Sequence, residues 1–301
     1  DGKGRRLAAD RWAVSRVKEL EPVGPVEIEI TNTGAPPVRA LQWPIDEPNT
    51  WYPTSVSNLL RCPRKTLLQK HLKLQGTSTD EGLELFSDVM WIGNVLHQVV
   101  ERAARPLIDN PQMLKQFRSL LHEAMTYELA HQDPHISPDL QAVLADSLMV
   151  RLEPLAEFFD SGRIASVLAV ERYVPVDQSS SALHARCDLV LKDAQGQRVL
   201  LDLKSGAAKT ASSLESDEAA GKSLQRAAYL IADPSADLAA MFYLGGGQQP
   251  YVVTGAQDKQ IAWALEALRR AKEHIKHGAF PMAGSSNADT CGNCDVRAAC
   301  R

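Results

Sequence analysis

Apolar residues alternate with polar ones, or run together, over five short stretches of the chain, and such patterns predict β-strands. Three strands are expected in succession, over residues 165–174, 182–191 and 198–203, followed by two more over 239–244 and 251–254. The second and third strands flank Gln195-Gly196-Gln197, which is typical of a tight turn. These two strands are therefore predicted to form a β-hairpin.

Elsewhere the apolar residues recur at spacings of three and four, which predicts helices. The expected helices cover residues 54–74, 83–102, 113–131, 138–159, 223–231 and 258–277. Pro63 should break the first helix, and Gly278 should end the last. Gly93 costs its helix about 1 kcal/mol relative to alanine, so we expect another segment to pack closely against it. The polar, small-residue segment 205–222 is expected to be mobile.

The remaining composition is that of a globular protein of 301 residues with one large domain or two moderate ones. No apolar run approaches the roughly 18 residues of a membrane span, and no signal-peptide pattern follows the first residues, so the expected location is the cytoplasm and no membrane partner is expected. Residues 1–52 are rich in proline near their end and are predicted to be a linker or a lead-in from a preceding domain. The chain lacks an initiator methionine, which suggests a processed product or a piece of a larger protein.

The net charge of −4 does not indicate a nucleic-acid-binding protein, but local charge says more. Residues 48–79 contain no acidic residue and several basic ones. The candidate DNA contacts in this stretch are Arg61, Arg64, Lys65 and Lys70. The alternative is a solvated helix face, which is the commoner role of a charge run.

The predicted hairpin carries the main candidate chemistry. Asp188 starts its first strand, whereas Asp202 and Lys204 end its second strand and project to one face because they are two residues apart. Carboxylate oxygens suit Mg²⁺ or Mn²⁺, and a neighbouring lysine can activate water or neutralise phosphate charge. The alternative is a surface hairpin with solvated charges.

The cysteines suggest a second metal site. Cys291, Cys294 and Cys300 form a C-x₂-C-x₅-C pattern near the end of the chain, and three close cysteines require one distant partner to complete a zinc site or a [4Fe–4S] cluster. Cys62, beside Pro63, is the better candidate, because Cys187 lies inside a predicted strand and is most simply a buried apolar residue. Disulfides or unrelated free thiols are the alternative.

The order of these elements resembles a known family. It comprises Cys62-Pro63, Gly93-x₃-His97, Asp188, Asp202-Leu203-Lys204, Gln225-x₃-Tyr229 and the cysteine tail. Together they resemble the RecB-like branch of the PD-(D/E)XK nucleases, and within it the iron–sulfur-stapled subset found in the AddB subunit of bacterial helicase–nucleases and in CRISPR-adaptation nucleases. This sequence departs from the family in having Ala185 where a glycine is common and no proline before Asp188.

The resemblance implies an α/β (α+β) fold with a restriction-endonuclease-like central mixed sheet flanked by helices. It implies a nuclease domain over 53–301, with a helical insertion at 105–162 and a cluster-binding tail at 279–301. His97, Asp188, Asp202 and the carbonyl of Leu203 would hold Mg²⁺ or Mn²⁺, and Lys204, Gln225 and Tyr229 would act at the catalytic site. Cys62, Cys291, Cys294 and Cys300 would hold a [4Fe–4S] cluster.

The function implied is a metal-dependent DNA nuclease, an exonuclease of DNA end processing or recombinational repair that works with a helicase. The chain contains no G-x-x-x-x-G-K-[ST] motif, so any motor would lie on another domain or chain. Two alternatives stay open. One is a catalytically degenerate DNA-binding scaffold of a helicase–nuclease complex, and the other is a zinc-stapled interaction protein.

Overall fold

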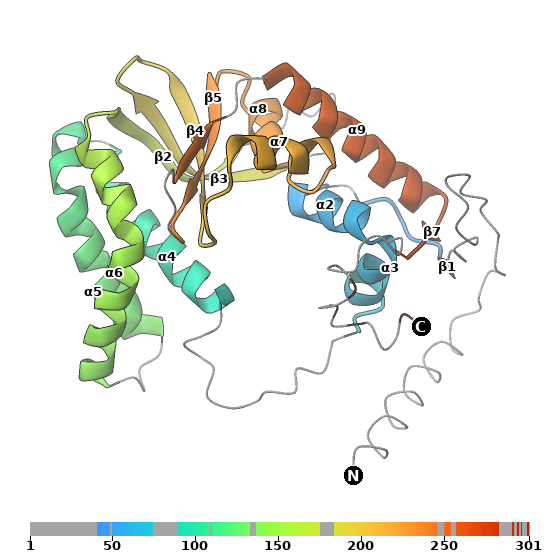
Figure 1. Cartoon of the computed structure of the whole chain (residues 1–301), viewed down its shortest axis with the longest axis horizontal. Coiled ribbons are helices and arrows are strands. Elements are labelled where there is room, and N and C mark those ends of the chain that lie inside the picture. Colours follow the sequence, from blue (N-terminus) through green and yellow to red (C-terminus); the bar gives the residue numbers. More distant parts are fainter. Residues whose placement is uncertain are drawn as a thin grey trace, which may run out of the picture. The chain divides into compact units, whose positions relative to one another are not determined.

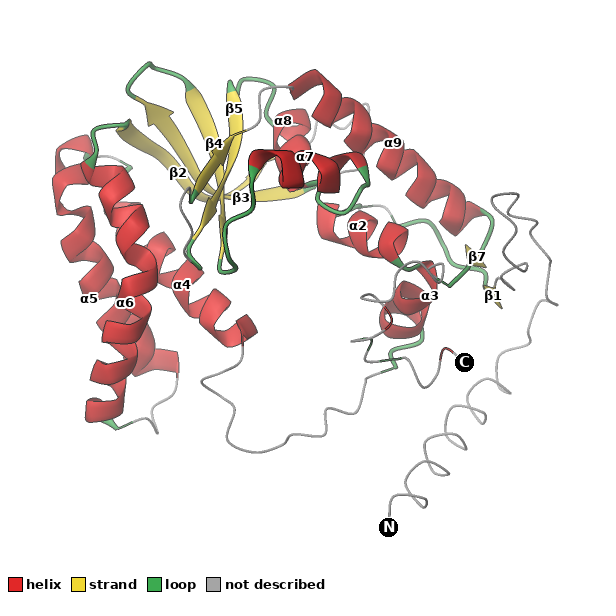
Figure 2. Cartoon of the chain, viewed as in Figure 1, coloured by secondary structure: helices red, strands yellow, loops and turns green. Residues whose placement is uncertain are grey.

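A computed structural model describes residues 41–48, 50–74, 89–108, 110–132, 137–174, 184–245, 250–253 and 257–282, together with Cys291, Cys294, Val296 and Cys300 (Figures 1 and 2). The chain divides into two compact units. One comprises Asp1–Asn49, Thr54–Asp80 and Leu265–Arg301, and the other comprises Thr50–Pro53 and Glu81–Ala264. We call them the terminal unit and the sheet unit. Most of the predicted lead-in, residues 1–40, lies outside the described residues.

The sheet unit is built on five strands in the order β2-β3-β4-β5-β6. Their bounds are Ile164–Val174, Ala185–Asp193, Arg198–Lys204, Leu238–Tyr243 and Tyr251–Val253. Strands β4 and β5 are parallel, whereas the other neighbours are antiparallel. The sheet is therefore mixed, with helices on both faces (Figure 2), and the predicted fold class is confirmed.

The predicted hairpin is strands β3 and β4. Their register runs from Leu189 opposite Leu201 to Lys192 opposite Arg198. Asp193 closes the turn, because its carboxylate accepts hydrogen bonds from the backbone N–H groups of Gln195 and Gln197. Gly196 has a φ of 85°, a conformation that glycine adopts without a steric penalty.

Three helices cover one face of this sheet (Figure 1). They are α4 (Val89–Ala104), α5 (Phe117–Gln132) and α6 (Pro138–Asp160), with the 3₁₀ turns Arg105–Leu107 and Pro111–Gln116 between α4 and α5. Alternate residues of the hairpin, such as Leu191 and Leu201, pack into the same apolar core as these helices. Helices α5 and α6 occupy the range predicted as a helical insertion, and Phe117 stacks on Phe159 between them at 3.9 Å.

The opposite face carries α7 (Ala211–Ala219) and α8 (Gln225–Ala232). The expectation that residues 205–222 are mobile is wrong for α7. Thr210 caps this helix by accepting a hydrogen bond from the backbone N–H of Ser213, and Leu214 is buried against Met241 and Tyr243 of β5. The Thr210 cap and the burial of Leu214 therefore stabilise α7, whose polar composition did not predict a helix.

A buried ion pair joins α7 to α8. Arg226 Nε and Nη2 donate to the two carboxylate oxygens of Glu218 at 2.8 and 2.6 Å. Both side chains are almost wholly inaccessible to solvent. Burial raises the pKa of Glu218, and the hydrogen bond and charge of Arg226 oppose that rise. The pair fixes one helix to the other because neither charge can be exposed without moving a helix.

The terminal unit joins segments from both ends of the chain. It contains β1 (Leu41–Gln42), α2 (Pro53–Arg61), α3 (Pro63–Thr66), a π-helical turn (Leu67–His71) and β7 (Ala279–Phe280), and α9 (Gln257–Lys276) runs into it from the sheet unit. Strands β1 and β7 pair antiparallel. Gly278 follows α9 with a φ of 58°, as predicted for a helix end. No described helix is long and apolar enough to cross a membrane.

The buried pair leads to a stability prediction. We expect Glu218→Gln to lower the free energy of unfolding by about 3–5 kcal/mol, because it leaves a buried guanidinium without its counter-charge. Urea unfolding followed by circular dichroism measures this.

The control is Asp217→Asn, which removes an exposed pair with Lys209 and should cost no more than about 1 kcal/mol. Equal losses in the two variants would contradict the stabilising role of the buried pair.

Candidate active site

Asp188 links the two strands of the hairpin where their ladder ends. The last paired residues are Leu189 and Leu201. Beyond them the carboxylate Oδ2 of Asp188 accepts a hydrogen bond from the backbone N–H of Leu203 at 2.7 Å. Asp188 thereby lies beside the Asp202-Leu203-Lys204 segment, as the sequence predicted.

Asp202 is the most buried acid of this group, with 4% of its surface exposed. Its Oδ1 accepts a hydrogen bond from the Tyr229 hydroxyl of α8, and Lys204 Nζ lies 2.6 Å from its Oδ2. Within the described residues, Oδ2 is buried and its one contact is this ion pair with the Lys204 ammonium. One oxygen of Asp202 is therefore held by Tyr229, whereas the other has only the charge of Lys204 beside it.

Electrostatics at Asp202 favour a cation. Burial raises the pKa of its carboxyl, Lys204 lowers it and the nearby charge of Asp188 raises it. Burial, followed by the charge of Asp202, also raises the pKa of Tyr229 well above its ordinary value, so the hydroxyl remains a donor. Two neighbouring carboxylates in a poorly solvated place repel each other, and a divalent cation would relieve that repulsion.

His97 reaches the same carboxylates from α4. Its Nδ1 lies 3.3 Å from Asp188 Oδ1. Burial lowers the pKa of His97, but the hydrogen bond and charge of Asp188 outweigh burial and raise it overall. Gly93, one turn earlier, allows this approach, because a Cβ there would lie 3.2 Å from Ser205 Oγ, just after Lys204. The close packing predicted at Gly93 is confirmed.

The segment after Lys204 is held by backbone contacts. The N–H of Leu244 donates to the carbonyl of Lys204 at 2.7 Å, and the N–H of Gly245 donates to the carbonyl of Gly206 at 3.1 Å. A Cβ at Gly245 would lie 2.4 Å from the Gly206 carbonyl, so only glycine fits. The end of β4, and with it Lys204, is fastened to β5.

Gln225 and Cys187 also lie in the sheet unit. Gln225 begins α8, half-buried, one helical turn before Tyr229. Cys187 is fully buried, and its thiol lies 3.1 Å from the carbonyl oxygen of Leu189 and 3.4 Å from that of Leu201. Burial raises the pKa of Cys187 well above its ordinary value, which agrees with its interpretation as a buried apolar residue.

The four predicted cluster cysteines all lie in the terminal unit. Cys62 is buried in the break between α2 and α3, and its sulfur accepts a hydrogen bond from the Lys65 N–H at 3.4 Å. Burial raises the pKa of Cys300, Arg64 lowers it, and Cys62, Cys294 and Cys291 raise it again. The charges of the other three thiols thus act on Cys300, and their binding of a common cluster stays a prediction.

The predicted basic stripe is not a uniform surface. Arg61 and Lys70 are exposed, whereas Arg64 and Lys65 are half-buried. Arg64 Nε donates to the carbonyl of Phe280 at 3.2 Å, and its backbone N–H donates to that of Pro281. Arg64 therefore also ties α3 to the segment that leads into the cysteine tail. DNA contact by the four basic residues stays a prediction.

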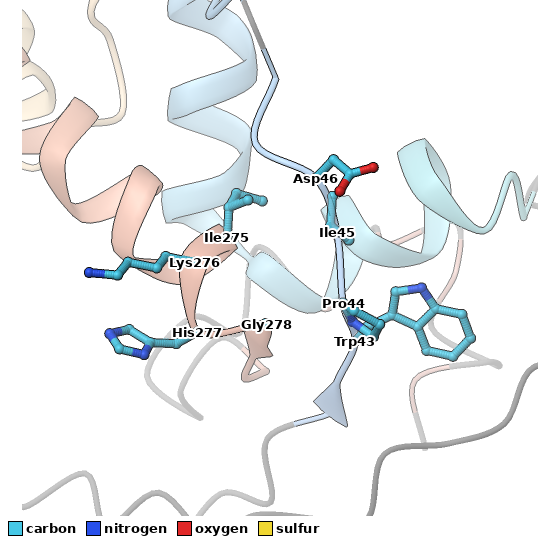
Figure 3. Close-up of a pocket in the computed structure, with 8 residues that line it drawn as sticks. All are labelled: Trp43, Pro44, Ile45, Asp46, Ile275, Lys276, His277 and Gly278. Carbon is cyan, nitrogen blue, oxygen red and sulfur yellow. The ribbon is translucent and has the colours of Figure 1, made fainter.

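A cavity of about 350 Å³ lies elsewhere in the terminal unit, lined by residues 43–46 and 275–278 (Figure 3). The picture shows Lys276 and His277 pointing away from Trp43. The lining includes none of the predicted site residues.

The metal ligands can be judged by their chemistry. Within the described residues, no three His, Cys, Asp or Glu side chains have the mutual spacing of metal ligands. Mg²⁺ does not require such a cage, because it is held by one or two carboxylates and completes its shell with water and phosphate. The carboxylates of Asp188 and Asp202 provide hard oxygen donors that fit this requirement, and the Leu203 carbonyl stays a predicted ligand.

Comparison with known proteins agrees with this geometry. Residues 50–301 match the PD-(D/E)XK nuclease superfamily, and the chain belongs to it. Its mixed sheet with flanking helices is consistent with the restriction-endonuclease-like fold of that superfamily. The crystal structure of SSO0001 aligns with 84% of this chain and 85% of that chain, at 13% identity and a TM-score of 0.33, a likeness too low to support an argument. No curated protein matches the chain.

The contact between His97 and Asp188 can be tested without any nuclease assay. We expect Asp188→Asn to lower the pKa of His97 in metal-free protein, because the variant removes the charge that offsets burial. The imidazole signals followed by NMR across a pH titration measure this.

In the native protein, His97 should accordingly stay protonated to a higher pH than in the variant. The exposed His122 on α5 provides an internal reference in the same spectra. An unchanged His97 titration would contradict the contact.

Proposed function

We propose that this chain is a metal-dependent nuclease that hydrolyses phosphodiester bonds in DNA. The observation that carries the proposal is the buried Asp202 carboxylate, which has Asp188 on the neighbouring strand, the Tyr229 hydroxyl on one oxygen and Lys204 2.6 Å from the other. A purely structural ion pair would not need a second carboxylate at the same place. Membership of the PD-(D/E)XK superfamily supports the same conclusion.

Asp188, Asp202, His97 and the carbonyl of Leu203 are the proposed ligands of Mg²⁺ or Mn²⁺. When bound, the ion would lower the pKa of water and stabilise negative charge on the phosphate. Asp188 is supported as a ligand by its fixed orientation, because Leu203 and His97 each hold one of its oxygens. Asp202 is supported as a ligand by its buried Oδ2 atom, which contacts only the charge of Lys204 within the described residues.

Lys204 and α8 supply the remaining roles. The side chain of Lys204 is 31% exposed, so its ammonium can reach a water or a phosphate oxygen beside Asp202. It would orient the attacking water by hydrogen bonding and stabilise the negative charge that develops on the phosphate. Tyr229 positions Asp202 through its hydroxyl, and Gln225 would contact substrate from the start of α8.

The order of motifs along the chain supports placement in the RecB-like, iron–sulfur-stapled branch. On this basis we propose that the enzyme is an exonuclease that acts at DNA ends in repair, alongside a helicase on another domain or chain. The basic residues Arg61 and Lys70 are exposed and suit contact with DNA phosphates.

Asp202→Asn tests the proposed function. With end-labelled single- and double-stranded DNA and Mg²⁺ or Mn²⁺, we expect the variant to lose at least about a thousandfold in kcat, because several kcal/mol of metal-assisted stabilisation disappear. Gel electrophoresis of the products over time measures this and also shows whether cleavage starts at an end.

The matched control is Asp146→Asn, the same change at an exposed position of α6. It should cleave as the unmodified protein does. Full cleavage by Asp202→Asn would contradict the assignment, and no cleavage by the unmodified protein under any of these conditions would favour the scaffold alternative.

We further propose that Cys62, Cys291, Cys294 and Cys300 hold a [4Fe–4S] cluster that joins the two ends of the terminal unit. The proposal is supported by the C-x₂-C-x₅-C spacing of the last three cysteines and by four cysteines being the usual ligand set of such a cluster. The cluster would be structural, in the same way that β1 paired with β7 joins chain ends in this unit.

Metal analysis tests the cluster. Protein purified without oxygen should be brown and contain about four irons per chain, and Cys300→Ala should lose both colour and iron because one ligand is missing. Cys187→Ala is the control and should keep both. A colourless protein that contains zinc would contradict the proposal.

A further inference from the structure

Arg186 lies next to the candidate active site on strand β3. It is two residues from Asp188, so both side chains project from the same face of the strand. Arg186 has 48% of its side chain exposed, compared with 14% for Asp188 and 31% for Lys204. Its guanidinium is therefore the more accessible of the two cations on the strand ends that carry Asp188 and Asp202.

Glu171 holds Arg186 from the neighbouring strand. The register of β2 with β3 places Val170 opposite Leu189 and Arg172 opposite Cys187, so Glu171 comes opposite Asp188. Its side chain forms an ion pair with Arg186 and is only 13% exposed. Glu171 also has a φ of 48°, a left-handed conformation that is uncommon for a residue other than glycine.

That backbone conformation occurs inside β2, which continues to Val174. Unfavourable backbone conformations persist where the surrounding structure fixes them, and they occur most often at functional sites. At this position a well-buried carboxylate is paired with an exposed guanidinium. The arrangement fixes the position of a long, flexible cation that would otherwise sample many rotamers.

The site is rich in negative charge, so a cation beside it would favour DNA binding. Asp188, Asp202 and Glu171 occupy neighbouring strands, and a DNA strand that approaches them brings further negative charge. Lys204 lies against Asp202 and Arg186 against Glu171, but Arg186 has the larger exposed fraction of its side chain. A guanidinium presents five N–H donors in a planar fork, and one edge can pair with a carboxylate while another binds phosphate.

We propose that Arg186 binds a backbone phosphate of the DNA strand adjacent to the phosphate that is cut, and that Glu171 positions its guanidinium. The inference rests on the proposed nuclease function and adds a substrate contact to it. Arg186 acts in binding, before and during the chemical step alike, so it contributes to KM rather than to kcat.

Cleavage kinetics of end-labelled single-stranded DNA with Mg²⁺ test the inference. We expect Arg186→Ala to raise KM about tenfold with kcat nearly unchanged, as for loss of one hydrogen-bonded charge contact. The slope of log(1/KM) against log salt concentration should fall in magnitude by about one, because one fewer phosphate contact releases counterions.

Lys192→Ala is the matched control. Lys192 is also an exposed cation on the same face of β3, but it lies at the hairpin end, opposite Arg198. It should change neither KM nor the salt slope. An equal effect of Lys192→Ala would show a general effect of net charge and would overturn the inference.

Glu171→Gln distinguishes positioning from metal binding. If Glu171 acts through Arg186, Glu171→Gln should raise KM, and the double variant with Arg186→Ala should be no worse than Arg186→Ala alone. A loss of kcat in Glu171→Gln that Arg186→Ala does not share would overturn this role for Glu171.

The same assays distinguish failure of the Arg186 contact from failure of the nuclease assignment. If the unmodified protein cuts DNA and Arg186→Ala has the same KM and salt slope, the phosphate contact is wrong and the nuclease assignment stands. If the unmodified protein does not cut DNA, the nuclease assignment fails and the inference fails with it.

Discussion

The carboxylate of Asp188 is the contact on which the candidate active site depends. Its Oδ2 atom accepts the N–H of Leu203, and its Oδ1 atom lies beside His97. One side chain thereby connects β3, β4 and α4 at the point where the hairpin ladder ends. The interaction replaces the backbone bonds that would otherwise continue the ladder, so the strands can separate without leaving Leu203 unsatisfied. The acids are consequently brought together by the same bond that keeps the strand ends in place.

The second constraint is the burial of charge behind the site. Asp202 is almost inaccessible to water, and its hydrogen-bond partner Tyr229 is located by α8. Helix α8 is fixed in turn by Arg226, whose partner Glu218 lies on α7. A chain of polar contacts therefore runs from the interior of the sheet unit to the acids. Such contacts are costly to bury singly, but together they leave few alternative positions for the Asp202 carboxylate.

The features that the sequence predicted are those that depend on local spacing. Alternating apolar residues and the Gln-Gly-Gln turn indicated the hairpin, and the spacing of Asp202 and Lys204 placed both on one face. Local spacing could not predict the parallel pairing of β4 with β5 or the hydrogen bond from Tyr229 to Asp202, because these contacts join residues far apart in the chain. Helix α7 was missed because its composition is polar and its buried acid is neutralised by a residue of the next helix. Arg186 was not predicted as a site residue, because an arginine on a strand is common and its ion pair with Glu171 is visible only in the folded structure.

The contact between Gly245 and Gly206 limits how this protein can vary in length. Since no side chain fits at residue 245, the two backbones form a fixed crossing just beyond Lys204. Residues added before Gly206 would have to break that crossing and would pull the catalytic strand end away from β5. Residues added after Gly206, ahead of the Thr210 cap of α7, would only enlarge a loop. Natural relatives and engineered versions should therefore accommodate extra segments on the α7 side of the crossing, where new substrate-contacting loops can arise without disturbing the acids.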